Sequence, residues 1–150
     1  MKSSLLEIQE RFDNDVERFS NLETGQISTI DASLGLELLT QVAFSICPNA
    51  KSALDLGCGA GNFSLKLIEL LPNLDCTLID LSQPMLRKAE ERIAEVSNGK
   101  IKAIQTDFLN MQLQSETFDI VVTGAAMHHL RTDEEWETVF EKIFKSLKKG

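Results

Sequence analysis

Residues 53 to 63 decide the fold, and they read Ala53-Leu54-Asp55-Leu56-Gly57-Cys58-Gly59-Ala60-Gly61-Asn62-Phe63. A short apolar run with one carboxylate leads into a glycine-rich turn, and the residues that follow have the apolar spacing of a helix. A strand, a glycine turn and a helix in this order let backbone N–H groups approach a ligand closely, because glycine has no Cβ and tolerates positive φ. The stretch therefore predicts a loop that holds a nucleoside-containing cofactor.

Composition narrows the class of protein. The chain has 150 residues, enough for one domain with a substantial core, and a net charge of −8, which argues against non-specific binding to nucleic acid. Cys47, Cys58 and Cys76 fit neither a disulfide framework nor a zinc site, because they are odd in number and irregularly spaced. We expect reduced thiols in a cytoplasmic protein. No apolar run approaches the ~20 residues that span a bilayer, so we expect no membrane partner.

The hydrophobic pattern divides the chain into helices followed by alternating strands and helices. It predicts a helix over 4–20 and a second one, capped by Ser28 or Asp31, that ends near residue 46. It predicts strands over 51–56, 75–80, 100–106 and 118–123, and helices over 62–71, 83–96 and from Thr132 or Asp133 onward. Strands that alternate with helices predict right-handed crossovers and a parallel, doubly wound α/β sheet. The strand over 118–123 is apolar at its centre, as expected of a strand covered on both faces.

Polar and glycine residues follow each predicted strand. Ligands of such sheets bind beyond the carboxyl ends of the strands, so Gly57, Asp80, Asp107 and Gly124 are expected to lie along one edge. A carboxylate at Asp80 can accept both hydroxyls of a ribose, and Asp107 with the N–H of Phe108 can recognise an adenine edge. Taken singly, each of these residues also fits a tight turn, a helix cap or an ordinary loop.

Taken together, the motifs of residues 50–150 resemble those of the class I S-adenosylmethionine-dependent methyltransferases. The matching segments are 54–61, Asp80, 106–108 and 118–122, and the run 126–130 looks like the small-molecule branch of that family. The resemblance implies a Rossmann-like, mostly parallel sheet, here apparently truncated after the fourth strand and the helix that follows it. It also implies direct displacement of a methyl group from S-adenosyl-L-methionine to a small-molecule acceptor, which leaves S-adenosyl-L-homocysteine.

The resemblance also implies the residues that contact the cofactor. Asp55 is expected to organise the glycine loop and to meet the methionine amino group, Asp80 to hold the ribose, and Asp107 with Phe108 to read the adenine. Met85 is expected beside the adenine, although it also fits a core position. The full set expected by this resemblance is Asp55, Gly57, Cys58, Gly59, Gly61, Asp80, Leu81, Met85, Asp107, Phe108, Gly124 and Ala125.

Catalytic and lid residues are less clearly marked. His128 and His129 follow the fourth predicted strand, so either is a candidate general base, although both also fit packed or helix-start positions. No metal is expected, because two adjacent side chains rarely converge on one ion. By the same resemblance, residues 1–47 form a helical lid over a core of residues 48–150, with lid candidates Phe12, Phe19 and Gln26. The alternative for the two phenylalanines is that they only dock an amphipathic helix.

The chain departs from the family at its last residues, 147–150, where relatives turn into a fifth strand. We therefore expect a fragment of a longer methyltransferase, with the open edge of the fourth strand covered by a homodimer or by the N-terminal helices. The alternatives are a cofactor-binding module without turnover, a tRNA-modifying methyltransferase and an NAD-dependent dehydrogenase. Asn62, at a position where a dinucleotide-binding loop usually has glycine, argues against the last.

Overall fold

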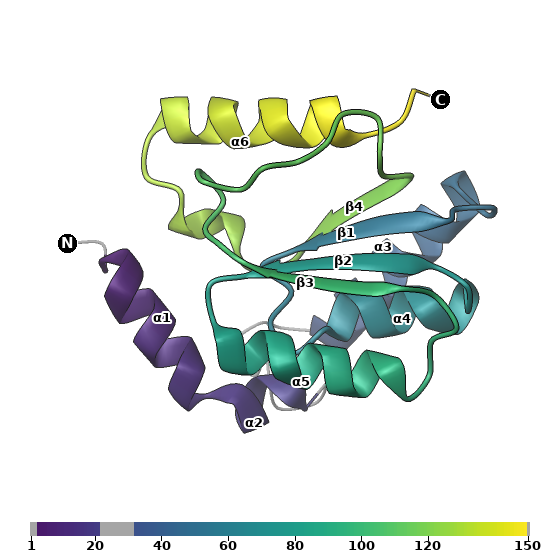
Figure 1. The fold of residues 1–150 in the computed structure, drawn as a ribbon, viewed down its shortest axis with the longest axis horizontal. Helices are drawn as coiled ribbons and strands as arrows, with labels where there is room; N and C mark the ends of the chain where they lie inside the picture. The colour runs from purple at the N-terminus through teal and green to yellow at the C-terminus, as the bar shows by residue number, and fades with distance from the viewer. Residues whose placement is uncertain (1–2, 22–31, 150) are drawn as a thin grey trace.

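The computed structural model describes residues 3–21 and 32–149, and Gln26, Ser28 and Asp31 lie outside these ranges. Figure 1 shows a sheet with helices on both faces, which confirms the predicted α/β class. All strand pairs are parallel, in the order β3-β2-β1-β4. The elements are α1 (Leu5–Asn14), α2 (Val16–Ser20), α3 (Ala32–Ile46), β1 (Ser52–Leu56), α4 (Asn62–Leu70), β2 (Asp75–Asp80), α5 (Gln83–Ala94), β3 (Ile101–Gln105), β4 (Ile120–Thr123), the 3-10 helix η1 (Met127–His129) and α6 (Asp133–Ser146).

Two apolar clusters hold the layers together. On one face of the sheet, Leu67 of α4 and Ile93 of α5 are fully buried against β1 and β2, and Phe44 of α3 packs at the margin of this cluster. On the other face, Val139 of α6 packs with Leu54 of β1. Burial of apolar surface of this kind is the main stabilising term in folding. The two clusters fix the sheet, so the loops at its carboxyl end leave from a rigid base.

The N-terminal segment forms two helices rather than the one predicted over residues 4–20. Ser4 and Glu7 form a reciprocal capping box that starts α1. The prediction was wrong at Asp15, whose backbone leaves the helical region and whose carboxylate pairs with Arg18, 2.6 Å away. Both α1 and α2 contact α5, whereas α3 packs against α4. Only the first two helices therefore lie at the carboxyl end of the sheet (Figure 1).

The outer strand β4 is covered on both faces but lies at the edge of the sheet. Val122 packs on the cluster of one face and Val121 on that of the other, so both faces are covered as expected, but both side chains stay half-buried because β4 is an edge strand. The described N-terminal helices contact α4 and α5, and the predicted homodimer stays a prediction. Just before β4, Phe118 forms a parallel bridge with Leu147, and the Phe118 N–H donates to the Ser146 carbonyl at 3.0 Å. The last described residues thus run beside the lead into β4.

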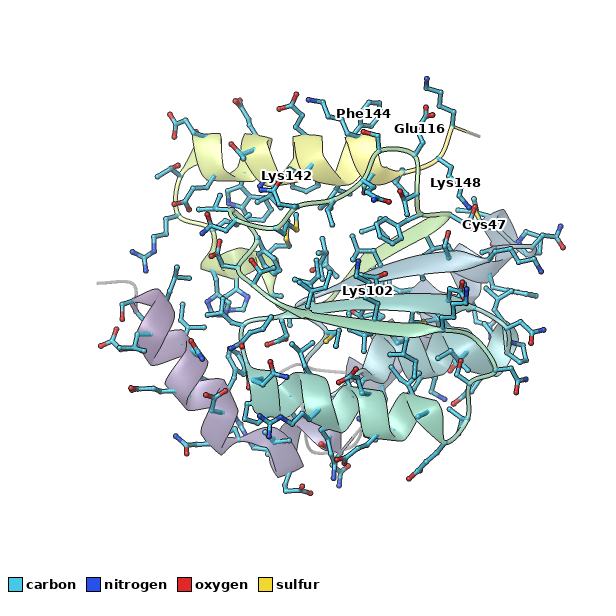
Figure 2. The ribbon with its side chains drawn as sticks, viewed as in Figure 1. Cys47, Lys102, Glu116, Lys142, Phe144 and Lys148 are labelled. Carbon is cyan, nitrogen blue, oxygen red and sulfur yellow. The ribbon has the colours of Figure 1, made fainter. Side chains whose placement is uncertain are left out.

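The amino end of the sheet is held by Asp119. Its carboxylate accepts hydrogen bonds from the Lys51 and Ser52 N–H groups, each at 2.9 Å, and from the Lys148 ammonium at 2.9 Å. Figure 2 shows Lys148 beside Cys47 at this end of the molecule. Burial alone would raise the pKa of Asp119, but hydrogen bonds from Lys148, Lys51 and Ser52 outweigh it and lower the pKa to about 2. This aspartate ties three segments together as a fully paired ion.

The described residues contain neither a candidate membrane-spanning helix nor a candidate metal site. None of the helices in residues 3–21 and 32–149 is long and apolar enough to cross a membrane. In the same residues no group of three or more His, Cys, Asp or Glu side chains is placed to hold a metal ion. Cys47, Cys58 and Cys76 are all free thiols. The cytoplasmic location stays a prediction.

Candidate cofactor-binding site

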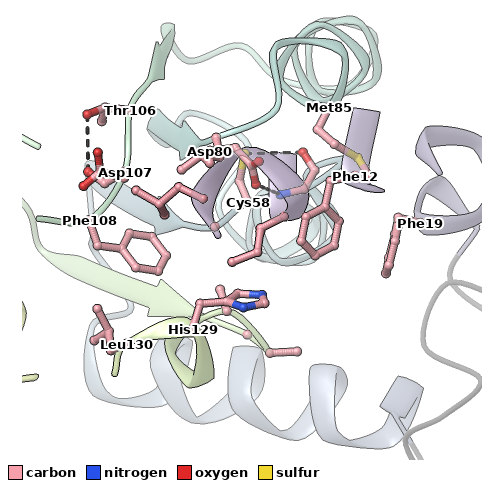
Figure 3. Close-up of a pocket in the computed structure, with 18 of the residues that line it drawn as sticks. Phe12, Phe19, Cys58, Asp80, Met85, Thr106, Asp107, Phe108, His129 and Leu130 are labelled. Atoms are coloured by element: carbon pink, nitrogen blue, oxygen red, sulfur yellow. Dashed lines mark hydrogen bonds between the residues drawn. The ribbon is translucent and has the colours of Figure 1, made fainter. Parts of the chain in front are cut away.

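A cavity of about 470 Å³ lies at the carboxyl end of the sheet, between the glycine loop and helices α1 and α2. Figure 3 shows residues from both sides of it, among them Asp80 and Phe108 from the strand ends, on the left, and Phe12 and Phe19 from the N-terminal helices, on the right. Asp55, Gly61 and His128 do not line this cavity. The residues expected at the cofactor that do line it are Gly57, Cys58, Gly59, Asp80, Leu81, Met85, Asp107, Phe108, Gly124 and Ala125.

The three glycines of the loop have positive φ but different surroundings. A Cβ on Gly57 would lie 2.4 Å from the Cβ of Ala126, so this position has no room for a side chain. A Cβ on Gly61 would lie 3.1 Å from Ala89, which gives this glycine a role in packing α4 against α5. At Gly59 nothing lies within 4 Å of the Cβ position, although the residue lines the cavity. The backbone at Gly59 is therefore open to a ligand.

Asp80 ends β2 beneath the same loop. One carboxylate oxygen accepts the Gly59 N–H at 2.8 Å and the other accepts the Ser82 N–H at 2.9 Å. Burial raises the pKa of Asp80 against the lowering effect of these hydrogen bonds. None of the described lysines or arginines forms an ion pair with this carboxylate. Each oxygen keeps lone-pair capacity for a hydroxyl donor at the cavity wall.

Asp55 lies deeper, under the glycine loop. It is 2% exposed, and one carboxylate oxygen accepts both the hydroxyl of Ser64 at 2.8 Å and its N–H at 3.3 Å. The other oxygen, Oδ1, has no hydrogen-bond partner in the described structure. Burial raises the pKa of Asp55 to about 7 despite the bonds from Ser64. The geometry ties the end of β1 to the start of α4, and direct contact of Asp55 with a ligand stays a prediction.

Asp107 stabilises the turn after β3. Its carboxylate accepts the N–H groups of Leu109 and Asn110, each at 2.9 Å, and the side-chain amide of Asn110 at 2.7 Å. Burial would raise the pKa of Asp107, but these hydrogen bonds outweigh it and the pKa is lowered. An ionised carboxylate at the cavity can still accept from an amine, so its predicted contact with adenine is compatible with the geometry but untested.

The wall after β4 contains a feature that the sequence did not reveal. Ala125 has φ of 53°, a conformation that non-glycine residues rarely adopt and that often marks functional sites. The neighbouring Gly124 has no room for a side chain, because a Cβ would lie 2.0 Å from the ring of Phe63. This tight, strained segment lines the cavity directly beside the glycine loop, because the Cβ position of Gly57 meets Ala126.

The structure separates the two histidines. His129 lines the main cavity, where its ring meets Phe12 edge-on with centroids 6.0 Å apart. The His128 ring lies 4.0 Å from that of His129 at a tilt of 42°, and it lines only a smaller adjoining pocket, with Arg11, which His129 also borders. Sequence reasoning missed other lining residues at the start of α1 and around the start of α6, namely Ser4, Leu5, Ile8, Leu130, Arg131 and Glu135. The spacing of Leu5, Ile8 and Phe12 on one helix face could have indicated the first group.

Comparison with known proteins links this chain to methyltransferases. The profile of a family described as a methyltransferase domain matches residues 53–150. An uncharacterized methyltransferase from Anoxybacillus flavithermus is 38% identical over 97 residues, which are 65% of this chain and 42% of the relative. A demethylmenaquinone methyltransferase from a Geobacillus species is 29% identical over 101 residues, which are 67% of this chain and 42% of the relative. The chain thus spans less than half the length of these curated relatives.

Among solved structures, the N-methyltransferase NodS from Bradyrhizobium japonicum, in complex with S-adenosyl-L-homocysteine, superposes with a TM-score of 0.71. The match covers 93% of this chain and 69% of NodS at 21% identity, which establishes a shared fold.

Proposed function

This chain belongs to the family of methyltransferase domains, and from that premise we propose that it binds S-adenosyl-L-methionine in the cavity and serves methyl transfer to a small-molecule acceptor. One observation carries the proposal. The open backbone of Gly59 and the buried carboxylate of Asp80 are joined by a hydrogen bond and line the same cavity. A cofactor with a ribose and a positive charge fits this combination of bare backbone and unneutralised carboxylate.

The residues around the cavity fit the parts of the cofactor. Asp80 accepts the ribose hydroxyls, and Gly59 lets the loop approach them without a side chain in between. Asp107 and the N–H of Phe108 serve the adenine, while Gly124 and Ala125 border the methionine end. Leu81 and Met85 flank the ring; Met85 is also 1% exposed, so it packs in the core as well. Asp55 acts from below by holding the loop.

The bound cofactor supplies a methyl group that its positive sulfur already activates. The chain's own task is to position the acceptor and exclude water. Leu5, Ile8 and Phe12 of α1 provide an apolar wall on the side away from the glycine loop, which supports a lid role for α1 and α2, the first part of the predicted lid of residues 1–47 over the core of residues 48–150. Of the two histidines, we favour His129 as the group that takes a proton from the acceptor, because it lines the cavity.

Equilibrium binding tests the cofactor directly. The chain is expected to bind one S-adenosyl-L-homocysteine and to show no comparable affinity for NAD. Preference for NAD would contradict the proposal and support a dehydrogenase. Labelled methyl transfer from S-adenosyl-L-methionine to a small-molecule extract tests turnover. Binding without transfer would leave a cofactor-binding module, and transfer only to tRNA would replace the small-molecule acceptor.

The histidine assignment has its own control pair. His129→Gln is expected to lower the transfer rate by about 100-fold or more while cofactor affinity stays within about twofold. His128→Gln, one position away, is expected to leave the rate nearly unchanged. Equal losses in both variants would show that the pair supports packing rather than proton transfer.

A further inference from the structure

Asn62 stands directly after the glycine loop and makes contacts that cofactor binding does not require. Its side-chain nitrogen Nδ2 donates to the Phe19 carbonyl at 3.1 Å, across 43 positions of sequence. Its oxygen Oδ1 accepts from Nη1 of Arg92 at 2.9 Å. The amide thus lies between the end of the N-terminal helices and α5.

Arg92 fixes the direction of this amide and also holds the glycine loop. The same Nη1 atom donates to the carbonyl of Ala60, in the middle of the loop, at 2.6 Å. A guanidinium has only donors, so the oxygen of Asn62 must face it and the nitrogen must face Phe19. Burial lowers the pKa of Arg92, and partial loss of water strengthens such hydrogen bonds.

Among the described residues, helices α1 and α2 have two other polar attachments, and both lead to α5 or its cap. A separate contact, from the Arg131 guanidinium to the Ser3 carbonyl, holds the residue before the Ser4 cap. The Ser82 hydroxyl, which caps α5, donates to Asp13 at 2.5 Å, and Lys88 lies 3.3 Å from Glu17. The attachment through Asn62 differs, because it alone of these three also reaches the glycine loop, through Arg92 and Ala60. It lies at Phe19, whose ring lines the cavity.

We propose that Asn62 and Arg92 form a latch that couples closure of helices α1 and α2 over the cavity to the shape of the glycine loop. The proposal rests on the proposed function, because the closed lid is inferred to retain S-adenosyl-L-methionine and its product. Both residues are positioning residues. Closing the lid orders the loop through the amide and the guanidinium, and an ordered loop in turn favours the closed lid.

Asn62→Asp removes only the hydrogen bond from the Asn62 side chain to the Phe19 carbonyl. One aspartate oxygen still accepts from Arg92, but the other faces the Phe19 carbonyl, and two acceptors repel. Asn73→Asp is the matched control, because it adds the same charge in an exposed turn between α4 and β2. Arg92→Met removes the hydrogen bonds to Asn62 and to the Ala60 carbonyl, so it frees the amide to turn and releases the loop, and it is expected to have the larger effect.

Two measurements on the 150-residue chain test the latch: hydrogen exchange and the affinity for S-adenosyl-L-homocysteine. Hydrogen exchange of the ligand-free protein is expected to accelerate in residues 5–20 of Asn62→Asp, about 5- to 10-fold, with core strands unchanged. The dissociation constant for S-adenosyl-L-homocysteine is expected to rise by a similar factor, mainly through faster dissociation. Asn73→Asp is expected to match the unaltered chain in both, and Arg92→Met to exceed Asn62→Asp.

The outcomes separate this inference from the proposed function. Exchange and affinity in Asn62→Asp equal to those of Asn73→Asp would overturn the latch even if the unaltered chain binds the cofactor tightly. Faster exchange in the core strands as well would also overturn it, because it would show general destabilisation. Failure of the unaltered chain to bind S-adenosyl-L-homocysteine would instead contradict the proposed function, and exchange alone would then decide whether the lid is latched.

Discussion

Aspartates at the two ends of the sheet have opposite environments and opposite pKa shifts. At the amino end, Asp119 accepts hydrogen bonds from two backbone N–H groups and pairs with Lys148, and its pKa is lowered to about 2. At the carboxyl end, Asp55 and Asp80 form no ion pair among the described residues, and burial raises the pKa of both. One residue type therefore serves as a satisfied structural ion at one end and as unneutralised acceptors at the other.

This difference indicates that the amino end of the sheet contributes mainly to stability and the carboxyl end to ligand binding. A paired aspartate contributes to stability, whereas a buried carboxylate without a cation lowers it and is retained only where another purpose requires it. Perturbed carboxylates beside a cavity are a recognised sign of a functional site. The carboxyl end is accordingly the end at which we place the cofactor.

The largest expected effect is at the amino end. Asp119→Ala is expected to lower the free energy of unfolding by about 2–3 kcal/mol, because it removes the partner of Lys148 and of two N–H groups. Urea denaturation at pH 7 measures this. The folded pKa of Asp119 is depressed, so its contribution is present above pH ~4 and is lost as the pH falls toward 2. A gap between variant and unaltered chain that did not narrow at pH 3 would contradict the account.

A smaller effect of opposite sign is expected at Asp55. Its folded pKa is raised to about 7, so the stability that the carboxyl contributes is present below pH ~4 and is lost as the pH rises through about 7. Asp55→Asn keeps an oxygen for Ser64 but removes this loss. The stability of the variant relative to the unaltered chain is expected to increase by about 1–2 kcal/mol between pH 6 and pH 8. Denaturation at the two pH values cancels the cost of the amide itself, and parallel pH profiles would refute the assignment.

The smallest effect on stability is expected at Gly59. Gly59→Ala meets no neighbour and costs about 1 kcal/mol of unfolding free energy, from positive φ alone. The added methyl group points into open space at the cavity. The free energy of binding S-adenosyl-L-homocysteine is therefore expected to fall by more than the free energy of unfolding does. Gly61→Ala, which meets Ala89 of α5, is expected to show the reverse. For both variants, calorimetric titration measures the affinity and thermal unfolding measures the stability.

Much of the fold was predictable because local chemistry agrees with it. The bounds of β2 and the Ser82 cap of α5 follow from short-range pattern and hydrogen bonding, and both were confirmed. The break at Asp15 was missed, because apolar spacing alone continues across it. The edge position of β4 was expected, and the half-buried Val122 agrees with it.

The lining residues at the strand ends were predictable, but most of those supplied by α1 and by the segment around the start of α6 were not. Strand ends gather at one edge by topology, which placed Asp80 and Asp107 at the cavity from sequence alone. Sequence could not choose between His128 and His129, because their directions depend on the 3-10 turn that carries them. The contacts of Asn62 depend on a helix far away in sequence, and no local pattern encodes them.

The most direct test compares the two ends of the sheet in one titration series. The dissociation constant for S-adenosyl-L-homocysteine is measured for the unaltered chain, for Asp80→Asn and for Asp119→Asn. The account predicts binding of one molecule per chain, a loss of affinity of about 10- to 100-fold in Asp80→Asn, and no change in Asp119→Asn. No binding to the unaltered chain, or equal losses in the two variants, would contradict it.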